Sequence, residues 1–386
     1  IRICREEMKY IKLKEVCMIN MGQSPDSSSY NEKKEGIPFY QGNADFGEKY
    51  PITRVWCNTP IKIAQSGDIL ISVRAPIGAL NYAKEECCIG RGLAAITPDK
   101  EKMSLEFVYW FLKGKNLELN RKGTGSTFKA ISRKVLEEIM IPDINLKKQC
   151  EYANVLEKIH AAIQMRKQEL KHLDFLLKAR FVEMFGDPVA NEMGWDTLPL
   201  ENACKAIVDC PHSTPSYTKE DTGFRCIRTS IVKKNRILWD EIEYIPEDEY
   251  VKRIQRKKPD VGDIVYTREG AILGIAAIID RNCNVALGQR SMLLSPNIDK
   301  CASEFLCVAM NSDSFLDNAL KGVSGSASPH INVGDIKAFR MIMPPIELQN
   351  QFVDFVHQVD KSKVAVQKAL DETQILFDSL MQKYFG

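Results

Sequence analysis

The sequence predicts an α+β protein in which two similar mixed α/β domains are joined by a pair of long antiparallel coiled-coil helices. Three observations support this fold class. Short strings of residues recur at a spacing of about 195–202, each recurring segment ends in a long heptad pattern, and 44% of the 386 residues are hydrophobic, enough for two cores. The repeat also predicts an internal pseudo-twofold symmetry.

The repeat is visible in strings that keep their order in both halves. Gly67-Asp68-Ile69-Leu70 returns as Gly262-Asp263-Ile264-Val265, and Phe185-Gly186 returns as Phe385-Gly386. The spacing drifts by a few residues, as loop insertions between two copies would cause. The chain therefore divides into a first domain at 1–143, a first long helix at 144–186, a second domain at 187–345 and a second long helix at 346–386.

Each domain is expected to mix strands with helices. Ile69, Ile71 and Val73 alternate with the residues between them after a Gly-Asp turn, as in a strand. Ser104 stands directly before an apolar helical pattern, where its hydroxyl can cap the first turn.

The long helices carry the strongest local pattern. Apolar residues recur at alternating spacings of four and three for about four heptads, which is the a/d seam of a coiled coil. Two matching seams in one chain most simply pair with each other, and a twofold between them requires antiparallel helices; the alternative is that each helix packs on its own domain. We expect a charge in the seam, as in Leu170→Asp or Leu370→Asp, to disrupt the pair. The seam residues are Leu156, Ile159, Ile163, Leu170, Leu173, Leu177, Val356, Val359, Val366, Leu370 and Phe377.

Composition excludes several classes of protein. The formal charge of +2 excludes a uniformly basic DNA-coating protein and an acidic disordered chain. The longest apolar stretch, 271–279, is far too short to cross a bilayer, so no membrane association is expected. The 12 cysteines are scattered without a C-x-x-C pair, which favours a reducing compartment and a cytoplasmic protein.

No catalytic motif is present in the sequence. It lacks a G-x-x-x-x-G-K-[ST] phosphate loop, an H-E-x-x-H, a G-x-S-x-G and the Asn-Pro-Pro-aromatic motif of adenine methyltransferases. We therefore expect no catalytic residue, no metal site and no cofactor bound by this chain. Two alternatives stay open: a DNA nuclease or methyltransferase with an unrecognised active site, and a coiled-coil scaffold that does not bind DNA.

The distribution of charge favours nucleic acid as the partner. Residues 1–186 carry a formal +7 and residues 187–386 carry −5, yet the second domain holds basic runs at 225–236 and 252–258. Basic side chains beside Ser, Thr and Asn suit phosphate contacts and groove reading in double-stranded DNA. Two similar domains with different loops would read different half-sites, which predicts an asymmetric bipartite target.

At this point the chain resembles the specificity (S) subunits of type I restriction-modification enzymes, over essentially its whole length. The strings that carry the resemblance are GDILISVRAPIG (67–78), IGRGLAAI (89–96), IP (141–142), FGDP (185–188) and PPIELQ (344–349). The resemblance implies that 1–143 and 187–345 are target-recognition domains and that the long helices are conserved spacers.

The resemblance also implies partners. Two methyltransferase (M) subunits would dock along the helices, and restriction (R) subunits would join them. S-adenosylmethionine, ATP and Mg are then expected on those partner subunits, while the S subunit does no chemistry. The methyltransferase would flip an adenine out of the duplex and methylate it.

Candidate DNA-binding residues are chosen by chemistry, because the base-reading loops are what varies in such a family. Arg and Lys read guanine, Asn and Gln read adenine, and small hydroxyls adapt to either. After two corresponding strands come Gln41, Asn43 and Asp45, and Arg228, Thr229 and Ser230, with Lys233 and Lys234 in the adjoining basic run. The Gly/Ser loops add Ser126, Thr127 and Lys129, and Ser324, Ser326 and His330. Arg74 and Arg91, with Arg268 and Arg290 in the other half, either hold phosphate or brace a loop.

Overall fold

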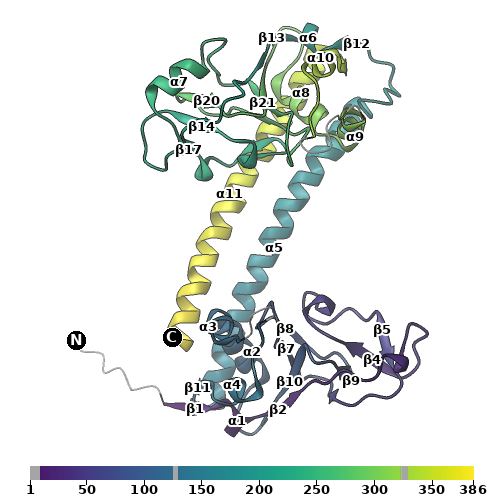
Figure 1. Ribbon diagram of the computed structural model, residues 1–386, viewed down its shortest axis with the longest axis vertical. Coiled ribbons are helices and arrows are strands. Elements are labelled where there is room, and N and C mark those ends of the chain that lie inside the picture. The colour runs from purple at the N-terminus through teal and green to yellow at the C-terminus, as the bar shows by residue number, and fades with distance from the viewer. Residues whose placement is uncertain (1–8, 125–128, 322, 324–328) are drawn as a thin grey trace. The chain divides into compact units, whose positions relative to one another are not determined.

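The computed structural model describes residues 9–124, 129–321, 323 and 329–386, and the chain forms two compact units (Figure 1). The first unit joins Ile1–Lys167 to Lys368–Gly386, and the second is Gln168–Gln367. Each unit therefore contains one globular domain and part of each long helix.

The first domain is built around an antiparallel sheet with the strand order β2-β10-β7-β8. A second sheet has the order β3-β5-β4-β9-β6 and includes a parallel pair, β4 with β9, while β1 pairs with β11. The strands are β1 (Tyr10–Lys12), β2 (Cys17–Met21), β3 (Tyr30–Asn31), β4 (Ile37–Tyr40), β5 (Val55–Cys57), β6 (Ile63–Ala64), β7 (Ile69–Ser72), β8 (Leu80–Tyr82), β9 (Cys87–Ile89), β10 (Leu93–Pro98) and β11 (Met140–Pro142). The helices are α1 (Leu13–Val16), α2 (Leu105–Gly114), α3 (Asn116–Lys122) and α4 (Arg133–Glu137), with 3-10 turns η1 (Ser27–Ser29) and η2 (Asn43–Asp45).

The second domain repeats this plan. Its antiparallel sheet has the order β13-β21-β18-β19, and a second sheet, β17-β14-β20, again includes a parallel pair, β14 with β20. The strands are β12 (Thr197–Pro199), β13 (Cys204–Asp209), β14 (Arg225–Ile227), β15 (Val232–Lys233), β16 (Arg236–Ile237), β17 (Glu243–Tyr244), β18 (Ile264–Thr267), β19 (Ala276–Ile278), β20 (Val285–Leu287), β21 (Ser291–Pro296) and β22 (Arg340–Ile342). The helices are α6 (Leu200–Ala203), α7 (Glu247–Arg253), α8 (Ser303–Met310), α9 (Asp313–Leu320) and α10 (Val333–Ala338), with 3-10 turns η3 (Thr229–Ile231) and η4 (Trp239–Glu241).

Local chemistry accounts for several of these elements. The Ser104 hydroxyl accepts a hydrogen bond from Phe107 N and caps α2, as the sequence predicted. All residues of β7 and of β18 are buried, which accounts for the apolar runs Ile69–Ile71 and Ile264–Val265.

A buried glutamine fastens the start of each long helix, α5 (Leu146–Phe185) and α11 (Ile346–Phe385), to the preceding domain. Gln149 and Gln349 are fully buried. Gln149 accepts from Ser104 N (2.8 Å) and donates to Lys102 O (3.0 Å) and Ile144 O (2.7 Å). Gln349 accepts from Ala302 N (2.9 Å) and donates to Lys300 O (3.1 Å) and Pro344 O (2.8 Å). The internal repeat thus extends to individual hydrogen bonds.

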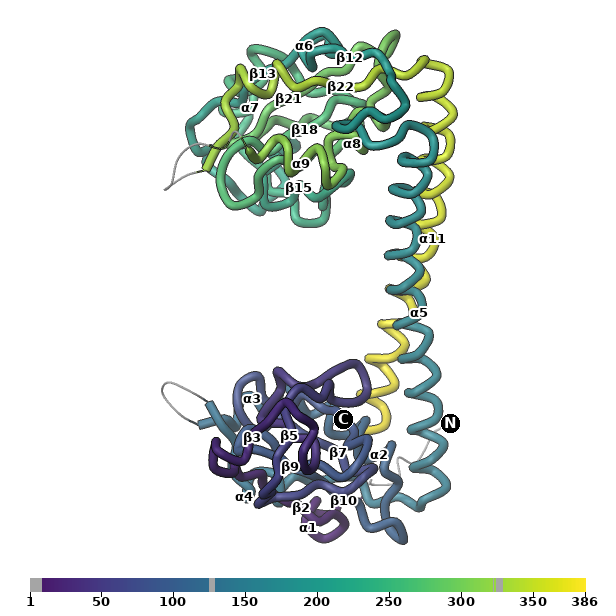
Figure 2. Tube along the Cα trace, turned by 90° about the vertical axis from the view of Figure 1, so that its right-hand side faces the viewer, coloured from purple at the N-terminus to yellow at the C-terminus, as the bar shows by residue number. Residues whose placement is uncertain are grey.

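The two long helices run side by side in both units, as Figure 1 and Figure 2 show. In the first unit Tyr152 stacks on Tyr384 with ring centroids 3.8 Å apart, and the Arg166 guanidinium donates to the Thr373 hydroxyl. In the second unit Lys363 Nζ lies 2.8 Å from Asp174 Oδ1, and Phe181 packs on Phe352. Along these contacts the residue numbers increase in α5 and decrease in α11, so the two helices are antiparallel. All the predicted seam residues are buried or half-buried.

The far end of each helix is anchored by a phenylalanine. Phe185, which ends α5, packs on Phe305 of α8 with centroids 4.8 Å apart. Phe385, which ends α11, packs on Phe107 of α2 at 5.3 Å. All four rings are buried, and each buried Phe contributes about 1.5–3 kcal/mol. Each helix therefore starts on one domain and ends on the other, which rules out the alternative of packing only on its own domain.

His160 lies in a mixed aromatic and polar cluster where α5 meets α2. Its ring packs on Trp110 (centroids 5.1 Å apart), and its Nε2 lies 3.2 Å from both Lys113 Nζ and Gln164 Nε2. Burial, followed by the charges of Lys113 and Lys167, lowers the pKa of His160 to about 4. The folded first unit therefore favours a neutral imidazole that accepts a hydrogen bond.

We expect the first unit to lose stability as the pH falls from about 6.5 to about 4. The folded pKa of His160 lies below its unfolded value, so the unfolded state binds more protons in this window. The loss should be about 1–2 kcal/mol, after allowance for a half-exposed ring, and no loss from this source is expected above about pH 7. Urea unfolding of the wild type and His160→Gln measures it, with the exposed His172→Gln as control. Curves for the wild type and His160→Gln that stay parallel across the pH range would contradict this expectation.

Candidate nucleic-acid interface

A ladder of backbone hydrogen bonds gathers four predicted residues in the first domain. Gly92 N donates to Gln41 O (3.1 Å), and Val73 N donates to Gly92 O (2.9 Å). Ala75 N donates to Lys129 O (3.2 Å), next to a bridge between Arg74 and Ala130. This ladder includes, or lies one residue from, four predicted residues: Gln41, Arg91, Arg74 and Lys129. Segments that are distant in sequence therefore converge at this part of the first domain.

The second domain has the same ladder. Gly288 N donates to Ile227 O (2.9 Å) as Gly90 N donates to Tyr40 O (2.8 Å), so Arg228 occupies the place of Gln41. Arg268 N donates to Arg290 O (3.1 Å), which gathers these two predicted arginines at the same point of the framework. His330 joins them through its bridge to Glu269.

The ladder corrects two equivalences expected from the sequence. Arg268 N donates to Arg290 O as Val73 N donates to Gly92 O, so Arg290 occupies the place of Gly92 and not that of Arg91. Ile131 N donates to Val73 O and Ile331 N donates to Arg268 O, both at 2.9 Å, so Arg268 occupies the place of the buried Val73. The counterpart of Arg74 is Glu269, one residue later. The two domains therefore present side chains of opposite charge at this position.

The predicted residues of the first domain differ in accessibility. Gln41, Arg74, Arg91 and Lys129 are exposed, while Asn43 is half-buried. The Asp45 carboxylate accepts from the backbone N–H groups of Gln41 (2.8 Å) and Gly42 (3.3 Å), so it shapes the turn that presents Gln41. Ser126 and Thr127 lie outside the described residues, as do Ser324 and Ser326 of the second domain.

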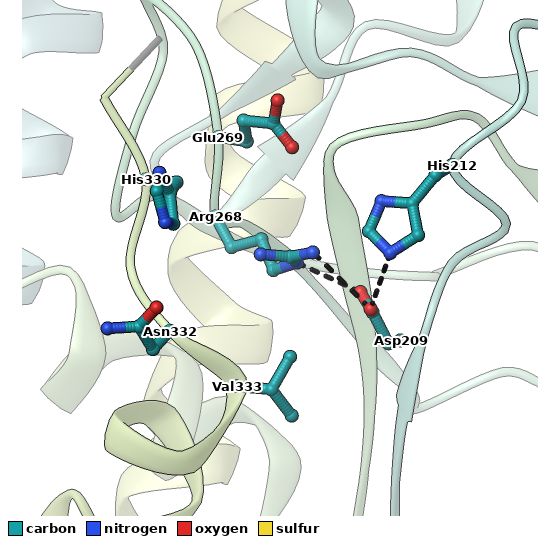
Figure 3. Close-up of a pocket in the computed structure, with 7 residues that line it drawn as sticks. All are labelled: Asp209, His212, Arg268, Glu269, His330, Asn332 and Val333. Atoms are coloured by element: carbon teal, nitrogen blue, oxygen red, sulfur yellow. Dashed lines mark hydrogen bonds and ion pairs between the residues drawn. The ribbon is translucent and has the colours of Figure 1, made fainter. Parts of the chain in front are cut away.

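The second domain has an open pocket of about 560 Å³ (Figure 3). The Arg268 side chain points at Asp209, with Nε 2.9 Å from Oδ1 and Nη2 3.3 Å from Oδ2, and His212 Nε2 lies 3.1 Å from Oδ2. Arg268 is 7% exposed, so its geometry fits the bracing role and not the phosphate role. The residues that line the pocket are Asp209, His212, Arg268, Glu269, His330, Asn332 and Val333.

The equivalent place in the first domain is apolar. The strand registers place Asp209 at the position of Met21, since Asp209 lies opposite Met292 and Met21 lies opposite Ala94. The ion pair of Asp209 with Arg268 therefore lies at positions that Met21 and Val73 occupy in the first domain. The same framework holds a charged pair in one domain and two apolar side chains at the equivalent positions of the other.

Arg228 is held by two neighbours at the end of β14. Its Nη1 lies 2.6 Å from Glu243 Oε2, and its guanidinium lies over the Tyr217 ring at 4.8 Å from the centroid. The hydrogen bond that Arg228 donates to the Glu243 carboxylate raises the pKa of Arg228, while burial raises the pKa of Tyr217. Thr229 and Ser230 follow in η3, half-buried and exposed respectively.

Lys233 and Lys234 are not part of this cluster. Lys233 Nζ donates to Ser230 O at 2.7 Å. Lys234 Nζ lies 2.9 Å from Asp313 of α9, which also lies 3.5 Å from Lys178 of α5. Lys234 therefore faces the helices.

Within the residues that the structure describes, no group of His, Cys, Asp and Glu could hold a metal ion. None of the helices among these residues has the length and the apolar run that a membrane crossing needs. The cysteines among them are free thiols.

A family model decides what the repeated framework is. The model described as the type I restriction modification DNA specificity domain matches residues 5–174 and again residues 194–373. The chain belongs to this family. Members of the specificity family are the DNA-recognition component of type I restriction-modification systems. The presence of two such domains in this chain fits recognition of a DNA site that has two parts.

Relatives within the specificity family agree with this assignment. Over 156 residues the chain is 45% identical to a putative type I restriction enzyme MjaX specificity subunit of Methanocaldococcus jannaschii, a match that spans 40% of this chain and 37% of that relative. It is 21% identical to the type I restriction enzyme EcoBI specificity subunit of Escherichia coli over 97% of this chain and 85% of that one. The crystal structure of the S subunit from M. genitalium shares the fold, with a TM-score of 0.60 and 15% identity over 99% of this chain and 98% of that one.

Sequence reasoning missed several residues of the interface. Glu269 could have been found by applying the 195-residue spacing of the Gly-Asp strings to Arg74. Asp209, Tyr217 and Glu243 carry no local signal, because only the pairing of distant strands brings them to Arg268 and Arg228.

Proposed function

We propose that this chain is the DNA sequence-specificity subunit of a type I restriction-modification complex and does no chemistry itself. One observation carries the proposal: a single backbone framework occurs twice and holds different side chains at equivalent points. Gln41 corresponds to Arg228 and Arg74 corresponds to Glu269. Two domains with different side chains at equivalent positions suit an asymmetric bipartite site in double-stranded DNA, with one domain on each half-site.

The exposed cations of the first domain support contact with DNA. Arg74, Arg91 and Lys129 are exposed, and the ion pairs found among the described residues do not involve them. Cations of this kind contact phosphate oxygens and fix the register of a protein on a duplex. The base edges would then be read by neighbours on the ladder, such as Gln41.

Two equivalent apolar patches on the helices support docking of two methyltransferase subunits. Phe175 and Leu176 of α5 are 69% and 46% exposed, and Ile375 and Leu376 of α11 are 70% and 50% exposed. Each pair lies between seam positions and faces away from the partner helix. Exposed apolar pairs of this kind are typical of protein interaction sites, and two equivalent ones suit two copies of one partner.

The catalytic groups would belong to the partners. S-adenosylmethionine would bind to the methyltransferase subunits, and ATP and Mg would bind to restriction subunits, with the whole complex acting on DNA in the cytoplasm. The helix pair would set the distance between the two half-sites, because it joins the two recognition domains.

The test is to express this chain with the methyltransferase subunit of the same restriction-modification system and to map modified adenines in the host genome. The proposal expects methylation at one asymmetric split motif. Sequence-specific methylation by the methyltransferase subunit without this chain would contradict the proposal. Metal- or S-adenosylmethionine-dependent turnover by this chain alone would support an enzyme instead. No salt-sensitive DNA binding by the assembled complex would support a scaffold.

A further inference from the structure

We propose that Arg228 reads a guanine in the half-site of the second domain and that Glu243 and Tyr217 are positioning residues that hold its guanidinium for this contact. The inference rests on the proposed function and deepens it. It assigns one base to one domain, and it assigns a role to two residues that do not themselves touch DNA.

The strand pairing fixes this arrangement. β17 pairs with β14 so that Glu243 lies opposite Cys226, two residues before Arg228. The Glu243 carboxylate is 23% exposed and accepts from Arg228 Nη1 at 2.6 Å, which occupies one side of the guanidinium. The side chain of Arg228 is 46% exposed, so the rest of its planar donor fork is accessible.

Tyr217 supplies the second restraint. Its ring lies under the guanidinium at 4.8 Å, which favours one plane for the donors through a cation–π contact. The segment before Tyr217 is itself tied down, since the buried Arg253 donates to Ser213 O (2.6 Å) and to Leu287 O (3.2 Å). A guanidinium held at one edge and on one face loses little rotational freedom when it binds the O6 and N7 atoms of guanine.

The first domain provides an independent argument. Its β5 pairs with β4 so that Val55 lies opposite Phe39, and Phe39 corresponds to Cys226. Glu243 therefore corresponds to Val55, just as Arg228 corresponds to Gln41. A carboxylate (Glu243) therefore lies beside the cationic Arg228, whereas an apolar residue (Val55) takes its position in the domain that has the neutral amide Gln41.

The tyrosine is present in both domains, but its contacts differ. Tyr30 precedes Asn31, which pairs with Trp56, and Tyr217 precedes Thr218, which bridges Tyr244 at the equivalent point. Tyr30 stacks on Phe39 (centroids 4.6 Å apart) and its hydroxyl donates to Pro25 O, so it serves the core. In the second domain the corresponding ring also packs on the core, but its other contact is with the Arg228 guanidinium.

The experiment measures binding of the assembled complex with its methyltransferase subunits to duplexes in which each base of the second domain's half-site is varied. Arg228→Gln should reduce the preference for guanine at one position by about 10- to 100-fold and leave the other half-site unchanged. Glu243→Gln and Tyr217→Leu should reduce the same preference by about 10-fold with a smaller change in affinity for the other bases. Tyr217→Phe keeps the ring and should keep the preference.

Two outcomes would overturn the inference. Arg228→Gln could weaken binding equally for all sequences and reduce the salt dependence by about one ion, which would identify a phosphate contact. Alternatively, Glu243→Gln and Tyr217→Leu could lower affinity without changing the guanine preference, which would make both residues merely structural. Failure of the proposed function has a different signature, because the wild-type complex would then show no preference at any position.

Discussion

Leu156→Asp is expected to lower the free energy of unfolding of the first unit by at least about 4 kcal/mol and to separate the two long helices there. Leu156 is fully buried in the seam of α5. The substitution removes an apolar side chain from the core and places a carboxylate in a site without water. Leu370→Asp should have a smaller effect, because Arg166 contacts Thr373, one turn further along the helix, and can reach a new carboxylate.

Urea unfolding and hydrogen exchange of α5 and α11 peptides would measure this effect. Val155→Asp is the matched control, because it places the same side chain one residue away on an exposed face, at 39% exposure. Equal effects of Leu156→Asp and Val155→Asp would contradict the description of α5 and α11 as a coiled coil with a buried seam.

Phe175→Lys and Ile375→Lys should each remove one of the two methyltransferase subunits that we propose to dock on the helices. Phe175 is 69% exposed and Ile375 is 70% exposed, so neither substitution should destabilise the chain. A lysine in an apolar contact costs several kcal/mol if it is desolvated, enough to weaken each site by about 100-fold or more. The double variant should bind no methyltransferase subunit.

The stoichiometry can be read by native mass spectrometry of the purified complex. Val364→Lys is a suitable control, since Val364 is 70% exposed on the same helix pair but has no apolar counterpart at the equivalent position, Gln164. A single variant that loses both methyltransferase subunits would contradict two equivalent docking sites. A double variant that keeps both subunits would also contradict them.

Periodic and repeated features of this fold could be predicted from the sequence. The heptads identify α5 and α11 because their spacing is local and extends over several turns. The recurring strings identify two domains because strands such as β7 and β18 keep their turn and their apolar residues.

The interface could be predicted only in part. Gln41 and Arg228 were selected because each follows a short strand, and the ladder places them at equivalent points. The sheet β3-β5-β4-β9-β6 consists of strands of two to four residues, which have little local pattern. The partner of Arg228 depends on pairing between similarly short strands, β14 and β17, and the partner of Arg268 depends on the pairing of β13 with β21 and of β21 with β18. No string near either arginine indicates these partners.

We propose that each domain reads its own half of one DNA site. The most direct test is to replace residues 8–143 with the corresponding domain of another specificity subunit and to map methylated adenines again. We expect one half of the motif to change, while the other half and the gap between them stay the same. A motif that does not change, or that changes in both halves, would contradict it.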